Sequence, residues 1–230
     1  MNTSTFFAGV LAAALVPSAA LAQKPPKDPK PTNPPKGAAA LSVDVKPNPG
    51  VFTRPVALTG KLSGTTPINA VTIRLEQDDT RPYGDVYKPT GVTTTTGASG
   101  AYVFNLKPAK NTQYRAVAQT SPSVTSAARL ASIRPLVGLR VSTLTPRAGS
   151  RVRFSGIVLP ARNGAAISLQ KRGSTGRFVT VTRATLRASS PGSAYSVRIR
   201  VRRSGVYRVK LPGTLELVNG FSRTVSLVTR

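Results

Sequence analysis

Alternation of apolar and polar residues with a period of two is the feature that most constrains how this chain folds. In the stretch 193–211 the apolar parity holds Tyr195, Val197, Ile199 and Val201, and the other parity holds Arg198, Arg200 and Arg202. Such alternation is typical of a β-strand that buries one face. Helical spacing is hard to find anywhere beyond residue 40, so the sequence predicts an all-β fold.

Strand-like runs of this kind occur in two sets, 41–133 and 139–228, that resemble one unit written twice. LTG at 58–60 matches FSG at 154–156, and Ala101 with Tyr102 matches Ala194 with Tyr195. Tyr114 with Arg115 and Tyr207 with Arg208 match in the same way, and both tyrosines are expected in the core, of the tyrosine-corner kind. Units of about 90 residues with roughly seven short strands predict two tandem immunoglobulin-like β-sandwiches, at 41–136 and 137–230. A single long barrel is the weaker alternative, because a barrel would not require the pattern to restart near residue 139.

The segment before residue 41 predicts export followed by a spacer. Residues 6–16 form a short apolar run, and Ala20 and Ala22 precede Gln23 as in a signal-peptidase site. The run is too short to span a bilayer, which needs about 20 residues. Residues 1–22 are therefore predicted to be a signal peptide, and the mature chain is expected to have no membrane span. Residues 23–40, rich in proline and lysine, are predicted to be a disordered, extended linker.

Composition excludes much enzymology. The chain has no cysteine and no histidine, which removes disulfides, thiol nucleophiles, thiolate or imidazole metal sites and every triad that needs an imidazole base. No catalytic residue, cofactor or metal site is predicted. Glu76, Asp78, Asp79 and Asp85 form an acidic cluster, but their spacing does not fit a calcium-binding loop. A solvated turn that neutralises Arg74 and Arg81 is the favoured interpretation of this cluster.

The net charge of +26 comes from 33 Lys and Arg against 7 Asp and Glu, and it is concentrated in the second unit. Residues 137–230 hold 18 basic residues and one acid, Glu216, whereas residues 41–136 hold 11 basic residues and five acids. Strand parity predicts that one outer sheet face carries Arg151, Arg153, Arg198, Arg200 and Arg202, because the strand at 151–159 should pair with the strand at 195–201. Arg208 and Lys210 should project from the opposite sheet. Arginine suits bidentate contacts with phosphate and carboxylate, so these five residues are predicted to bind an anionic partner.

The second unit also resembles the tandem immunoglobulin-like modules of secreted envelope proteins from high-GC Gram-positive bacteria. The residues that carry this resemblance are Gly156, Pro160, Ala161, Gly164, Ala165, the run Leu169 to Arg172, Tyr207 and Arg208. The resemblance covers about residues 41–230 and implies a fold and an extracellular setting, with no catalytic residues. Fold alone does not supply a function.

The sequence thus predicts a secreted, non-enzymatic protein of the cell envelope that attaches electrostatically to an anionic envelope polymer or to an acidic protein surface. Nucleic acid is disfavoured as a partner, because aromatic platforms are expected to lie on the core parity. Two alternatives stay open. The first is a purely structural spacer whose basic charge is incidental. The second is an accessory domain pair that presents an enzyme encoded elsewhere.

Overall fold

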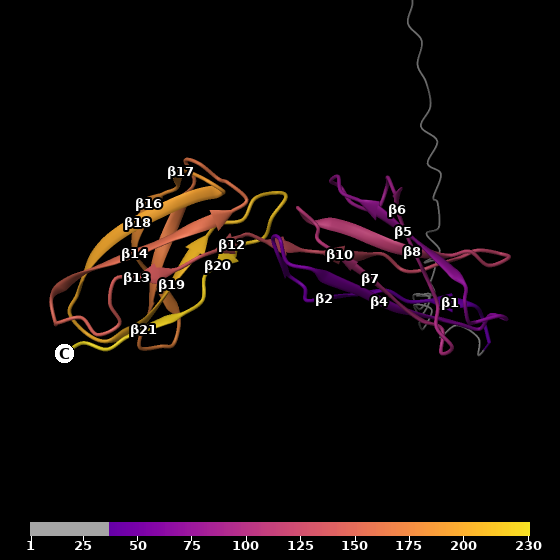
Figure 1. Ribbon diagram of the computed structural model, residues 1–230, viewed down its shortest axis with the longest axis horizontal. Helices are drawn as coiled ribbons and strands as arrows, with labels where there is room; N and C mark the ends of the chain where they lie inside the picture. The colour runs from indigo at the N-terminus through magenta and orange to yellow at the C-terminus, as the bar shows by residue number, and fades with distance from the viewer. Residues whose placement is uncertain (1–36) are drawn as a thin grey trace, which may run out of the picture. The chain divides into compact units, whose positions relative to one another are not determined.

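The computed structural model describes residues 37–230 of the 230-residue chain. The predicted signal peptide, 1–22, and most of the predicted linker, 23–40, lie outside the described residues. Residues 37–230 are all-β and contain no helix, so no helix long and apolar enough to cross a membrane occurs among them. Figure 1 shows the strands and their labels.

The strands of the first half form two antiparallel sheets and one short parallel pair. In one sheet the order is β1-β4-β2, with β7 also paired to β4; in the other it is β10-β8-β5-β6, with β9 also paired to β8. The strands are β1 (Ala40–Leu41), β2 (Asp44–Lys46), β4 (Val56–Ser63), β5 (Thr72–Asp78), β6 (Lys88–Thr95), β7 (Ala101–Leu106), β8 (Thr112–Ala118), β9 (Val124–Thr125) and β10 (Arg129–Ala131). The parallel pair consists of β3 (Gly50–Val51) and β11 (Ile133–Arg134).

The second half repeats the arrangement of two antiparallel sheets. One sheet has the order β12-β14-β18-β17, with β13 also paired to β14, and the other has the order β16-β15-β19-β20, with β21 also paired to β19. The strands are β12 (Leu136–Val137), β13 (Arg140–Val141), β14 (Ser150–Leu159), β15 (Ala166–Arg172), β16 (Phe178–Thr185), β17 (Arg187–Ser189), β18 (Gly192–Val201), β19 (Gly205–Leu211), β20 (Gly220–Phe221) and β21 (Val225–Leu227).

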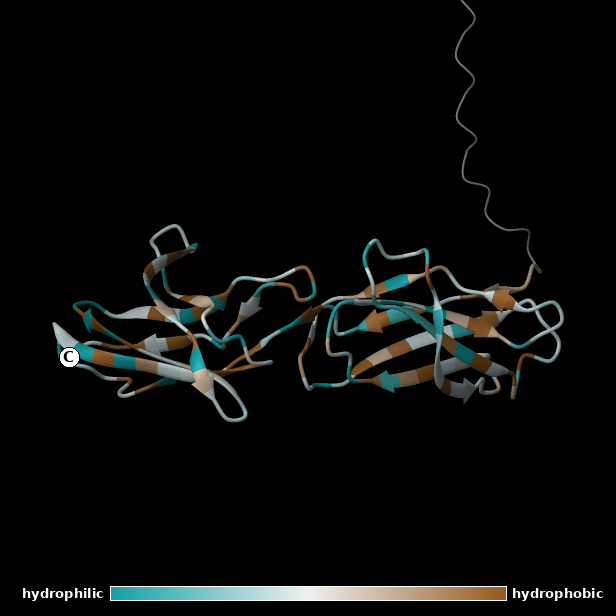
Figure 2. Ribbon diagram, turned by 90° about the horizontal axis from the view of Figure 1, so that it is seen from above, coloured by the Kyte–Doolittle hydropathy of each residue, from teal (hydrophilic) through white to brown (hydrophobic). Residues whose placement is uncertain are grey.

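Each half has its own hydrophobic core between its two sheets. The first core includes Leu58 and Phe104 from one sheet and Ile73 and Leu75 from the other. The second includes Val152, Phe154, Leu169, Tyr207 and Val209. Hydropathy alternates along the strands, as the banded ribbons in Figure 2 show, because successive side chains point to opposite faces of a sheet. The all-β prediction is confirmed, whereas the domain boundaries stay predictions.

A glycine–tyrosine pair, present once in each half, confirms the internal repeat. Gly60 on β4 lies opposite Tyr102 on β7, and Gly156 on β14 lies opposite Tyr195 on β18. The Tyr195 hydroxyl donates a hydrogen bond of 2.6 Å to the carbonyl of Gly138. A side chain at Gly156 would collide with the Gly138 carbonyl and the Tyr195 hydroxyl, so glycine is required there.

In a tyrosine corner the hydroxyl of a core tyrosine binds the backbone, and the sequence predicts this role for Tyr114 and Tyr207. Tyr114 and Tyr207 are buried in the two cores, as predicted. The hydroxyls that bind backbone carbonyls, however, belong to Tyr102, which donates to Ser42, and to Tyr195. Burial raises the pKa of both of these tyrosines, so each hydroxyl remains protonated and can donate.

Candidate functional site

The five predicted arginines are all exposed, four on one sheet of the second half and the fifth, Arg202, directly beside it. We call this set the arginine face: Arg151, Arg153, Arg198, Arg200 and Arg202. Strand β14 pairs with β18 in a register that puts Arg151 opposite Arg200 and Arg153 opposite Arg198. Residues of the other parity point inward; Val152 and Phe154 are fully buried and Val197 and Ile199 pack against the core. Arg202 follows directly after the last residue of β18.

No acidic side chain among residues 37–230 forms an ion pair with the arginine face. All four ion pairs found among residues 37–230 involve residues between Asp44 and Arg115, in the first half. Residues opposite one another in an antiparallel pair have Cβ atoms about 5 Å apart, so the two arginines within each pair repel one another. The second half has one acid, Glu216, in the loop that joins β19 to β20. The face is therefore an uncompensated cationic surface.

The equivalent positions in the first half lack these arginines. The shared register of the glycine–tyrosine pairs makes Ala57 and Asn105 equivalent to Arg153 and Arg198, and Ala57 does lie opposite Asn105. The equivalent strand pair of the first half thus forms without arginines at these two outer positions. The arginine face is a property of the second half and is not demanded by the architecture.

Two further arginines join this surface, and the sequence prediction missed both. Arg140 on β13 lies opposite Ser155, and Arg187 on β17 lies opposite Ala194, so both project from the same outer face. Strands β13 and β17 are two and three residues long, too short to show a period-two pattern. Only the sheet pairing, which brings distant segments together, reveals their side.

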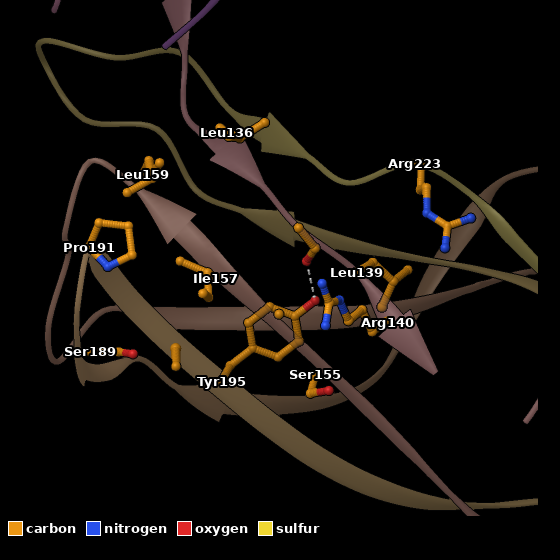
Figure 3. Close-up of a pocket in the computed structure, with 13 residues that line it drawn as sticks. Leu136, Leu139, Arg140, Ser155, Ile157, Leu159, Ser189, Pro191, Tyr195 and Arg223 are labelled. Carbon is orange, nitrogen blue, oxygen red and sulfur yellow. Dashed lines mark hydrogen bonds between the residues drawn. The ribbon is translucent and has the colours of Figure 1, made fainter. Parts of the chain in front are cut away.

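An open hollow of about 780 Å³ adjoins the arginine face (Figure 3). Its lining is mainly apolar and includes Leu136, Ile157, Leu159 and Pro191, with Arg140 beside them. Figure 3 also shows the hydrogen bond from Tyr195 to Gly138. The outer surface of this sheet therefore changes from cationic to apolar along β14, and both kinds of contact are available to one extended ligand.

The acidic cluster of the first half differs from the predicted solvated turn. Glu76 and Asp78 are buried. Glu76 accepts a hydrogen bond of 2.7 Å from each of Arg74 and Arg115. Burial alone would raise the pKa of Glu76, but the hydrogen bonds from Arg115 and Arg74 outweigh it and hold that pKa below its ordinary value. The prediction missed Arg115, which lies 39 residues from Glu76 in sequence.

Asp78 is held by backbone donors. Its two carboxylate oxygens accept hydrogen bonds from the amides of Thr80 and Gly84. Burial would raise its pKa, but these amides keep it lowered. Arg81, which the prediction paired with this cluster, instead lies with its guanidinium carbon 5.7 Å from the centre of the Tyr83 ring. The two buried acids therefore have structural roles in this half.

The aromatic residues are not all on the core parity, contrary to the expectation from sequence. Arg208 and Lys210 do lie on the second sheet, away from the arginine face, as predicted. The guanidinium carbon of Arg208 is 4.0 Å from the centre of the Phe178 ring and 4.4 Å from that of Phe221. Phe221 lies opposite Lys210, so it shares the outer side of this sheet.

The fold defines an all-β protein in which one antiparallel two-sheet unit is repeated. No family model matches the sequence, and no curated protein matches it. The chain is similar to a crystal structure described as a tetra-tandem repeat in the extending region of a large adhesion protein, with a TM-score of 0.35 and 18% identity. The similarity covers 83% of this chain and 49% of that chain, so this chain spans about half of its length.

Proposed function

We propose that this chain is a secreted, non-enzymatic protein of the cell envelope, built from tandem immunoglobulin-like β-sandwiches, that attaches electrostatically to an anionic polymer through the arginine face. The observation that carries this proposal is that two pairs of arginines lie opposite one another across the strands, Arg151 with Arg200 and Arg153 with Arg198. Like charges placed opposite one another reduce stability. An arrangement that costs stability and is absent from the equivalent first-half positions is best explained by an external anion.

The chemistry of the face favours a polymer with repeated anionic groups. Alternate residues of a strand are about 7 Å apart, so Arg198, Arg200 and Arg202 form a row of evenly spaced guanidiniums. Each guanidinium has five N–H donors in a planar fork that matches phosphate and carboxylate oxygens. A polymer of phosphate or carboxylate groups satisfies several such forks at once. Export, which such a partner requires, is proposed from the signal-peptide pattern of residues 1–22.

Binding to isolated envelopes and to heparin tests the proposal. The quartet variant replaces Arg151, Arg153, Arg198 and Arg200 with threonine, which suits strands. The off-face variant replaces four exposed arginines of the same half with threonine and so loses the same charge: Arg147, Arg177, Arg183 and Arg230. We expect the wild type and the off-face variant to be retained at low salt and released as salt rises, and the quartet variant to be lost from both supports.

The alternatives predict other outcomes. A structural spacer with incidental charge predicts that the quartet and off-face variants lose retention equally, since net charge alone then matters. An accessory pair for a separate enzyme predicts that the purified chain fails to bind envelopes until that enzyme is added. Either result contradicts attachment through the arginine face.

A further inference from the structure

A cluster of cationic and aromatic side chains lies around Arg208 on the other sheet of the second half. Its residues, which we call the Arg208 site, are Gln170, Arg172, Phe178, Arg208 and Phe221. It lies on strands β15, β16, β19 and β20, whereas the arginine face lies on β14 and β18. Binding at the Arg208 site is therefore independent of the proposed attachment through the arginine face.

The first half contains the same site with a carboxylate in it. Glu76 on β5 lies opposite Arg115 on β8, and Gln170 on β15 lies opposite Arg208 on β19. The Nε atom of Arg115 donates to Glu76 at 2.7 Å, and that of Arg208 donates to Gln170 at 2.9 Å. Arg115 also stacks on the Tyr87 ring at 4.0 Å, the same distance at which Arg208 stacks on Phe178.

The charges, however, differ between the two halves. The first-half site combines two arginines, Arg74 and Arg115, with the two buried acids Glu76 and Asp78. In the second half, Gln170 replaces Glu76, and two residues further along the strand Arg172 stands where the first half has Asp78. The second-half site thus has two guanidiniums, those of Arg172 and Arg208, and neither of the two carboxylates.

Arg208 is consequently held in place without an anion. Gln170 fixes its Nε atom, and the rings of Phe178 and Phe221 contact the guanidinium. The hydrogen bonds among residues 37–230 include none from its two terminal nitrogens. Burial, and then the nearby charge of Arg172, lower the pKa of Arg208, as expected for a guanidinium without a neighbouring carboxylate.

We propose that the Arg208 site binds, through the two terminal nitrogens of Arg208, the carboxylate of a glutamate or aspartate side chain in an acidic polypeptide. This carboxylate supplies the negative charge that Glu76 supplies in the first half. The preorganised guanidinium donates hydrogen bonds to both carboxylate oxygens, which is the geometry for which arginine is suited. The methylene groups of a glutamate pack against the rings of Phe178 and Phe221. Arg172 and Lys210 supply further positive charge at the edge of the site.

Substitution at Gln170 tests the proposal most sharply, because Gln170→Glu restores the internal carboxylate of the first half. The substitution keeps the bond to Arg208 Nε, so the folded state is expected to be retained. The new carboxylate neutralises the guanidinium of Arg208 and so removes its attraction for an external carboxylate. Leu144→Glu, at an exposed position in the loop between β13 and β14, makes the same change in net charge and serves as the control. Arg208→Lys keeps the charge but removes the planar fork.

The probe is a short fluorescein-labelled oligoglutamate, followed by anisotropy and by the ¹H–¹⁵N resonance of Arg208 Nε. We expect the oligoglutamate to shift that resonance in the wild type and in the quartet variant, which lacks four of the five residues of the arginine face. Gln170→Glu and Arg208→Lys should each weaken binding at this site by roughly ten- to a hundredfold. Leu144→Glu should stay within about twofold of the wild type.

Three results would overturn the proposal. The first is an Arg208 resonance that does not move when oligoglutamate is added. The second is equal binding by Gln170→Glu and Leu144→Glu, which would mean that only net charge matters. The third is tighter occupation of the site by polyphosphate than by oligoglutamate, which would assign it to phosphate. Loss of envelope retention in the quartet variant, with the Arg208 shift preserved, separates the two proposals.

Discussion

Reversing one charge of the arginine face should stabilise the protein, although it removes a proposed binding residue. Arg153 lies directly opposite Arg198, so Arg153→Glu converts a repulsive pair into an attractive one. Two guanidiniums about 6 Å apart in water repel by about 0.7 kcal/mol, and reversing one sign doubles the difference to about 1.4 kcal/mol. Screening reduces this gain to about 1 kcal/mol at roughly 20 mM salt and to about 0.3 kcal/mol at roughly 0.5 M.

Urea unfolding at the two salt concentrations measures this gain. Arg183→Glu is the matched control, because Arg183 is an exposed strand residue that lies opposite a serine, Ser168. It reports the benefit of adding a negative charge anywhere on a cationic protein. A gain for Arg153→Glu no larger than that for Arg183→Glu, or one that does not shrink in high salt, would refute the cross-strand repulsion on which the proposed function depends.

Two further predictions concern the parts of the fold that hold the strands in place. Gly156→Ala should destabilise the second half by about 2–3 kcal/mol, because its methyl group would collide with the Gly138 carbonyl and the Tyr195 hydroxyl; a thermal melt that matches the wild type would contradict this. Because the folded-state pKa of Glu76 is lowered, its contribution to stability is present above its unfolded value of 4.5 and is lost as the pH falls through the folded-state pKa. Glu76→Gln should therefore unfold more easily than the wild type at pH 7, by about 1–2 kcal/mol through the weakened bond from Arg115, and the two proteins should converge as the pH falls below the folded-state pKa of Glu76; parallel stability curves at all pH values would exclude this role.

Strand positions and the inward or outward side of most strand residues could be predicted because they follow from alternation within one strand. The arginine face is an example, since Val152 and Phe154 fixed the outward parity of their neighbours. The repeat was also visible, because spacing within the last strands is constant. These properties depend on local sequence.

The contacts that were missed depend on pairing between distant segments. Nothing near Glu76 in sequence indicates Arg115 as its partner, and nothing near Phe178 indicates that it stacks on Arg208. The contacts of strand β16 were hard to predict for a second reason. Its pairing with β15 shifts register between Leu169 and Gln170, which breaks the simple alternation along the strand.

The salt dependence of polyanion binding tests the central claim most directly. Each arginine that contacts a polyanion releases counterions, so the slope of log K against log salt reports how many take part. Titration of heparin into the wild type, the quartet variant and the off-face variant gives these slopes. We predict that the quartet variant loses roughly three units of slope while the off-face variant keeps the wild-type value. Equal slopes for the two variants would contradict attachment through the arginine face.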